Sequence, residues 1–76
     1  MRVRLAPRIV MDSEIRSGKP VVEGTRVPVD LVLAKLGGGM SFSQIGEEYD
    51  VTAEDILAVL AYAAHVVGNE EVRLAA

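Results

Sequence analysis

Few residues of this chain have side chains suited to catalysis. Its 76 residues include no cysteine and one histidine, His65. Nucleophilic catalysis needs a base beside the nucleophile, and metal sites need clustered ligands, so one histidine leaves few candidates. His65 lies inside an apolar run, where we expect a histidine packed in the core. The sequence therefore predicts no enzymatic activity, no catalytic residue, and no cofactor or metal site.

A phosphate-binding loop is suggested by Gly18-Lys19 and then excluded by its neighbours. That motif requires a glycine five positions before Gly18 and a serine or threonine after Lys19. Ser13 and Pro20 occupy these positions. We therefore do not interpret this segment as a nucleotide site.

Charge is distributed unevenly along the chain. Residues 1–26 contain six basic and three acidic groups, whereas the remaining residues contain two basic and eight acidic groups. Such asymmetry directs any nucleic-acid contact to the N-terminal end. By analogy with basic arms that enter the minor groove, the DNA-binding candidates are Arg2, Arg4 and Arg8. A solvated basic end, disordered or forming a strand, is the alternative.

The size of the chain allows one domain, residues 1–76, with a small core. Domains this short usually need a disulfide, a metal or a second subunit for stability. Without cysteine, oligomerisation or a partner protein remains, and we expect a homodimer or higher oligomer. No segment resembles a signal peptide, and the apolar stretch Ile56 to Val67 is too short to span a bilayer. The expected location is the cytoplasm.

Residues 1–27 have the pattern of short strands and turns. Arg8 to Met11 and Val21-Val22 are separated by glycine and proline turns, which favours a small hairpin or a pair of edge strands. Helical periodicity begins at Pro28, which suits a helix start, and this first helix ends at the run Gly37 to Gly39.

Two more helices are predicted within residues 28–67. Ser41 with Gln44 forms a capping box for the second helix, which ends at Asp50. Thr52 caps a third helix that reaches about Val67, and residues 68–76 form a tail that either extends this helix or frays. Gly46 provides the small residue at which the third helix crosses the second. The fold is therefore mainly α, a helix-turn-helix unit preceded by a short β segment.

The third predicted helix is apolar on every side, because eleven of the twelve residues from Ile56 to Val67 are apolar. A helix of this kind must be buried on every side. We expect one stripe to face the domain core: Ile56, Leu57, Leu60, Ala63, Ala64 and Val67. We expect the second stripe to form an oligomer interface with another chain: Val59, Tyr62 and Val66.

The same helix is a poor candidate for reading DNA. Base contacts in helix-turn-helix proteins come from the start of the recognition helix. Here that start carries Glu54 and Asp55, whose carboxylates would approach phosphates, and electrostatics dominates nucleic-acid affinity. We therefore do not expect this helix to enter a groove.

The string from Gly18 to Val29, GKPVVEGTRVPV, follows Arg8-Ile9-Val10 and Asp12. Together with Ala61-Tyr62-Ala63-Ala64 it resembles the bacterial and archaeal family named domain of unknown function 433, over residues 8–67. The resemblance implies a homeodomain-like three-helix fold and an antitoxin of the VapB kind. Such a protein is expected to bind and silence a PIN-like ribonuclease toxin, and often to repress its own operon by binding operator DNA.

Basic side chains are natural partners for the carboxylates of a metal-dependent nuclease site. The candidate toxin-binding residues cluster around the signature turns: Arg16, Lys19 and Arg26. Alternatively, Arg26 pairs with Glu23 or Asp30 and locks the β segment to the first helix. Two other functions remain open: a stand-alone DNA-binding regulator, and a structural or assembly module without a toxin.

Overall fold

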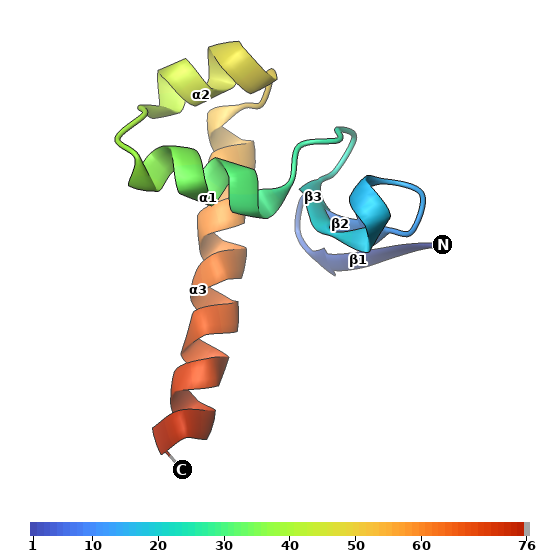
Figure 1. Cartoon of the computed structure of the whole chain (residues 1–76), viewed down its shortest axis with the longest axis vertical. Coiled ribbons are helices and arrows are strands. Elements are labelled where there is room, and N and C mark those ends of the chain that lie inside the picture. Colours follow the sequence, from blue (N-terminus) through green and yellow to red (C-terminus); the bar gives the residue numbers. More distant parts are fainter. Residues whose placement is uncertain (76) are drawn as a thin grey trace.

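A small sheet is followed by three helices in the computed structural model of the chain (Figure 1), which describes the backbone of residues 1–75 and the side chains of residues 1–69. The elements are β1 (Arg2–Ala6), β2 (Ile9–Asp12), a 3-10 turn η1 (Arg16–Gly18), β3 (Pro20–Val22), α1 (Val29–Gly37), α2 (Phe42–Tyr49) and α3 (Ala53–Ala75). The predicted order, a β segment and then three helices, is confirmed, with one strand more than expected.

The additional strand is β1, the segment that the charge pattern assigned to a basic arm. The sheet is antiparallel with the order β1-β2-β3, and Ile9 pairs with Val22 across β2 and β3. Arg8 turns the chain between β1 and β2 with a left-handed φ of 65°. Ile9 of β2 is completely buried and belongs to the core cluster that includes residues of all three helices. Residues 2–6 are therefore part of the sheet, which is the strand-forming alternative that the sequence left open.

α1 begins after Pro28, whose φ of -70° already suits a helix start. Val29 and Val32 are its buried residues, and they join the core. The helix ends at Gly37, and Gly39 adopts a φ of 98° that side chains rarely tolerate. The predicted stop at the glycine run is confirmed.

α2 and α3 are joined by three residues and turn through 108°. Both bonds of the predicted capping box are present, from the Gln44 backbone to the Ser41 hydroxyl and from the Ser41 backbone to the Gln44 side chain. Asp50 ends α2 in a left-handed conformation. A Cβ atom on Gly46 would lie 2.9 Å from the Val51 carbonyl oxygen. The crossing therefore requires a glycine here, as predicted.

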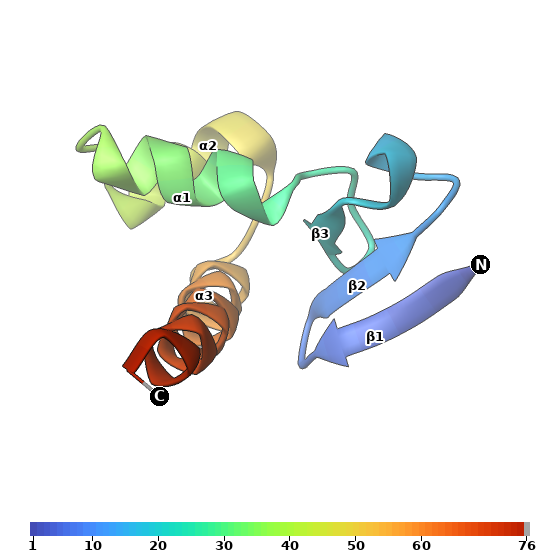
Figure 2. The ribbon, with the colours of Figure 1, turned by 60° about the horizontal axis from the view of Figure 1, so that its bottom comes forward.

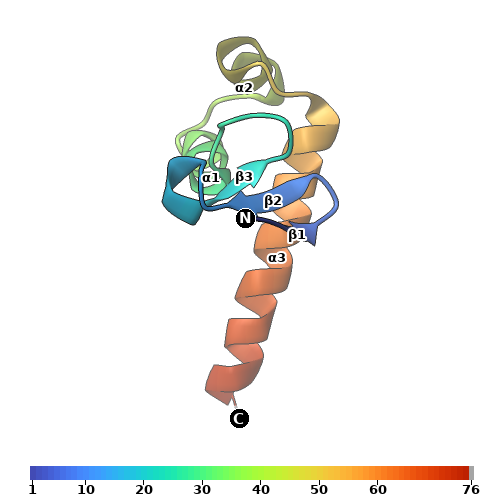
Figure 3. The ribbon, with the colours of Figure 1, turned by 90° about the vertical axis from the view of Figure 1, so that its right-hand side faces the viewer.

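α3 continues through Gly68 to Ala75, so the tail extends the helix, as one of the two predicted alternatives had it. Its C-terminal half projects beyond the other elements (Figures 1 and 3). Glycine inside a helix costs only about 1 kcal/mol relative to alanine, which need not end a helix of this length. No single described helix is long and apolar enough to cross a membrane; only Phe42–Tyr49 joined with Ala53–Asn69 across the 108° bend meets both criteria.

The core lies where the inner face of the sheet meets the three helices. Its buried members come from every layer: Ile9, Val22, Val29, Val32, Ile45, Val51, Ile56 and Val59. Val59 is completely buried, so its predicted place in an oligomer interface is wrong. Leu57 and Val67, assigned to the core by the sequence, are each 56% exposed. Ile56 lies in the core as predicted, but Val59 of the second predicted stripe is packed there as well.

Candidate protein-binding surface

The string from Gly18 to Val29, here called the signature segment, is entered through a backbone turn that is unusual for its residue types. Arg16, Ser17 and Gly18 all have positive φ, of 52°, 57° and 82°. The left-handed region is costly for residues that carry a Cβ, so this turn persists because its surroundings hold it. The backbone N–H of Gly18 donates to the carbonyl of Ile15, and that of Lys19 to the carbonyl of Arg16. The turn lies at the end of the sheet away from α3 (Figure 2).

Thr25 fixes the connection from β3 to α1. Its hydroxyl donates to the Val22 carbonyl at 2.8 Å and accepts from the Val27 backbone N–H at 3.0 Å. Gly24 precedes it with a φ of 80°, which explains the glycine of the signature. The Gly-Thr pair therefore serves to build the loop.

Glu23 joins this loop to β1. Its carboxylate accepts a hydrogen bond from Arg2 and two from Arg4, the latter at 2.8 and 2.9 Å. The guanidinium groups are about half exposed. Two of the three predicted DNA-contacting arginines are therefore engaged with a carboxylate of the same chain.

Lys19 performs the locking role that the sequence left open for Arg26. Its ammonium lies 2.8 Å from the Asp30 carboxylate on α1. The hydrogen bond from Lys19 lowers the pKa of Asp30 below its ordinary value. Among residues 1–69, no carboxylate lies within ion-pair distance of Arg26. The proposed pairing of Arg26 with Glu23 or Asp30 is therefore wrong.

Arg8 connects the β1–β2 turn to the start of α3. Its guanidinium lies 2.9 Å from the Asp55 carboxylate, which also accepts from the Thr52 backbone N–H at 2.9 Å. Burial alone would raise the pKa of Asp55, but the hydrogen bonds from Thr52 and Arg8 outweigh it and lower that pKa. The third predicted DNA-contacting arginine is therefore also held within the fold.

Arg16 and Arg26 are exposed, and no carboxylate among the described side chains pairs with either. Arg26 lines a cleft of about 280 Å³, and Arg16 follows Ile15, another residue of its wall. The other lining residues are Arg2, Val10, Asp12, Gly24 and Thr25. Of the three predicted toxin-binding residues, the structure leaves two available for an acidic partner and commits Lys19 to Asp30.

The remaining sequence-predicted residues lie on α3. Tyr62 is half-buried and Val66 is 40% exposed. His65 is exposed, not packed in the core as expected, and its Nε2 lies 3.2 Å from the Asn69 side chain. Tyr62 and His65 line an apolar hollow of about 220 Å³ between α3 and the β1–β2 turn. Within the described residues, no three potential ligands gather to hold a metal ion.

The similarity to known proteins includes the segment described above. Residues 9–63 match the family described as "Protein of unknown function (DUF433)". The chain belongs to the DUF433 family. The match covers β2, the signature loops, α1, α2 and α3 as far as Ala63. It excludes β1 and the projecting half of α3.

Two relatives extend the comparison of this DUF433 chain. An uncharacterized protein of Archaeoglobus fulgidus is 61% identical over 23 residues, which are 30% of this chain and 64% of that protein. The X-ray crystal structure of Rv2018 from Mycobacterium tuberculosis superposes with a TM-score of 0.70 and 31% identity. That superposition covers 78% of this chain but 29% of the mycobacterial chain. The DUF433 fold is thus similar to a smaller part of a longer protein.

Proposed function

We propose that this DUF433 chain is an antitoxin-like binding module that occupies an acidic site on a protein partner. The supporting observation is the exposed pair Arg16 and Arg26 beside the cleft. Arginine suits such a role because its planar guanidinium binds carboxylates through two parallel hydrogen bonds. A PIN-like ribonuclease, whose metal site is built from carboxylates, is the partner that the DUF433 resemblance favours.

The surrounding ion pairs support this assignment by holding the loops in place. Lys19 with Asp30, and Glu23 with Arg2 and Arg4, tie the signature loops to α1 and to the sheet. A preorganised surface loses less conformational freedom on binding than a flexible one. The loops that carry Arg16 and Arg26 therefore need no rearrangement to bind a partner.

The test is capture of the partner by the tagged full chain from its native host, followed by mass spectrometry. Stoichiometric recovery of one PIN-like nuclease is expected. Arg16→Glu with Arg26→Glu is expected to abolish that recovery while the melting temperature stays unchanged, since exposed unpaired residues contribute little to stability. Lys35→Glu, the same charge reversal near the end of α1, is the matched control. Recovery of the chain without a nuclease would reject the proposal.

DNA binding is the second candidate, and the geometry of α2 and α3 supports it. The 108° turn across three residues, with Gly46 at the crossing, suits a homeodomain-like helix-turn-helix. The start of α3 argues against base reading there, because Glu54 and Asp55 are acidic and Asp55 is already bound to Arg8. A gel shift with the operator region over increasing salt tests this function, since binding through phosphates weakens steeply with salt.

A further inference from the structure

One side of α3 carries an apolar seam that this chain does not cover. Leu57 is 56% exposed, Leu60 38% and Val67 56%, and Ala64 is exposed between them. These four residues, the α3 seam, follow one another at intervals of three, four and three residues. This is the spacing of the a and d positions of a heptad, at which two helices pack side by side.

The core of the chain uses a different side of the same helix. Ile56 and Val59 are 1% and 0% exposed and point into the core cluster. No charged residue occurs between Ile56 and Asn69, so the seam is bordered by neutral side chains. A surface helix normally carries charged residues on the side opposite its core. An apolar seam here indicates that another helix covers it.

We propose that the α3 seam binds the α3 seam of a second copy of this chain in an antiparallel dimer. The intervals of three, four and three read the same in both directions, so the seam is complementary to itself about a two-fold axis. Antiparallel packing places Leu57 opposite the partner's Val67, and Leu60 opposite the partner's Ala64. Each large residue of the central pair then meets a small one, which allows the helices to approach closely.

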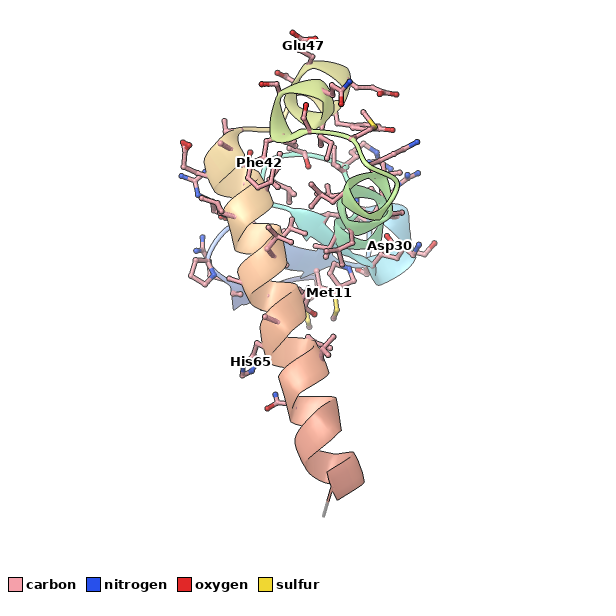
Figure 4. All side chains as sticks on the ribbon, turned by 90° about the vertical axis from the view of Figure 1, so that its left-hand side faces the viewer. Met11, Asp30, Phe42, Glu47 and His65 are labelled. Atoms are coloured by element: carbon pink, nitrogen blue, oxygen red, sulfur yellow. The ribbon has the colours of Figure 1, made fainter. Side chains whose placement is uncertain are left out.

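The area required for a stable dimer is larger than the seam alone provides. The seam runs for about 15 Å along the helix at 1.5 Å per residue, which is short for an interface that usually buries about 800 Å² on each partner. Phe42 at the start of α2 is 37% exposed and lies beside the first turns of α3, on the side away from the sheet (Figure 4). An antiparallel partner carries its projecting half across this region and adds Phe42 to the buried surface.

This interface is independent of the proposed function. The η1 turn lies at the end of the sheet away from α3 (Figure 2), and no residue of α3 lines the cleft beside Arg26, so one chain presents both surfaces at once. Failure of the dimer would leave nuclease capture unaffected, and failure of nuclease capture would leave the dimer intact. The two proposals are tested separately.

Light scattering on a sizing column measures the assembly of the full chain. We expect twice the chain mass of 8.1 kDa at micromolar concentration. Leu60→Glu places a charge on the seam and is expected to raise the dissociation constant at least a hundredfold while circular dichroism shows an unchanged helix content. Val66→Glu, a matched change at a residue 40% exposed but off the seam, is expected to keep the dimer. A monomeric wild-type chain, or a dimer that survives Leu60→Glu, would overturn the proposal.

Engineered disulfides test the direction of packing, because the chain has no cysteine of its own. In the antiparallel dimer two copies of position 57 lie about 15 Å apart along the axis, beyond the roughly 4.4–6.8 Å between Cα atoms that a disulfide spans. Leu57→Cys alone is therefore expected to stay unlinked under mild oxidation. Mixing it with Val67→Cys is expected to give a linked heterodimer. A homodimer linked through Leu57→Cys would overturn the antiparallel arrangement.

Discussion

Asp55 is the residue on which several parts of this fold converge. Its carboxylate caps the start of α3 through the Thr52 backbone N–H and receives the guanidinium of Arg8 from the sheet. In return the Asp55 backbone N–H donates to the Thr52 hydroxyl at 3.1 Å. One side chain therefore fixes a helix start and holds the β1–β2 turn against the helix.

Asp55→Asn is expected to destabilise the fold by about 1 kcal/mol at neutral pH, because it removes the charged partner of Arg8 and weakens the cap. The lowered pKa of Asp55 means that its ionised form stabilises the folded state. This contribution is complete above the unfolded pKa of about 3.9 and is lost as pH falls through the lower, folded pKa.

Urea unfolding of both proteins across pH 2 to 7 measures this dependence. The difference in free energy of unfolding between wild type and Asp55→Asn is expected to hold at about 1 kcal/mol down to roughly pH 4 and then to shrink. A difference that stays constant to pH 2 would show that the charge of Asp55 does not matter.

The ion pairs formed by the basic residues could not be predicted from the sequence alone. The chain places Lys19, Arg26, Glu23 and Asp30 within a short segment, and several pairings are compatible with it. The left-handed turn and the strand pairing of β3 decide among them, and these depend on contacts with β2. The basic cluster was therefore predictable, but the exposure of Arg16 and Arg26 and the role of Lys19 were not.

The end of α1, both ends of α2 and the start of α3 were predictable because their determinants are local. Ser41 with Gln44, Thr52 and the glycine run lie within a few residues of the ends that they define. The orientation of α3 was not predictable, because two apolar stripes on one helix compete for the core and only long-range packing chooses between them. Strand β1 remained one of several alternatives for the same reason, since its pairing with β2 is what makes it a strand.

The crossing of α2 over α3 yields a prediction for two glycines. Gly46→Ala places a methyl group 2.9 Å from the Val51 carbonyl oxygen, so the helices must separate or the turn must shift. We expect a loss of about 1–3 kcal/mol in the free energy of unfolding, as for overpacked cores. Gly37→Ala is the matched control, because nothing lies within 4 Å of the Cβ that it would add.

Gly37→Ala is expected to leave stability unchanged or to raise it by about 0.5 kcal/mol, since alanine is the better helix former. Thermal unfolding by circular dichroism compares the two variants. If Gly46→Ala were as stable as Gly37→Ala, the close approach of Gly46 to the Val51 carbonyl oxygen in the connecting turn would be disproved.

At the scale of the whole molecule, the core is small for the surface that it must support. Among the described residues seven apolar side chains are fully buried, while Leu57, Leu60 and Val67 of the α3 seam remain exposed. A chain of this size is marginally stable as a single copy. Stability and assembly should therefore be coupled, since a partner that binds only the folded state stabilises it by mass action.

The melting temperature of the wild-type chain is accordingly expected to rise with protein concentration. A hundredfold increase in concentration changes the free energy per dimer by about 2.7 kcal/mol, and each kcal/mol shifts the melting temperature of a unit made of two such chains by about 2–4 °C. Leu60→Glu, which weakens the seam, is expected to melt below the wild type at each concentration over the same range. Calorimetry from 5 to 500 micromolar makes the comparison. A wild-type melting temperature that ignores concentration would mean that the chain folds alone and that the seam has no part in its stability.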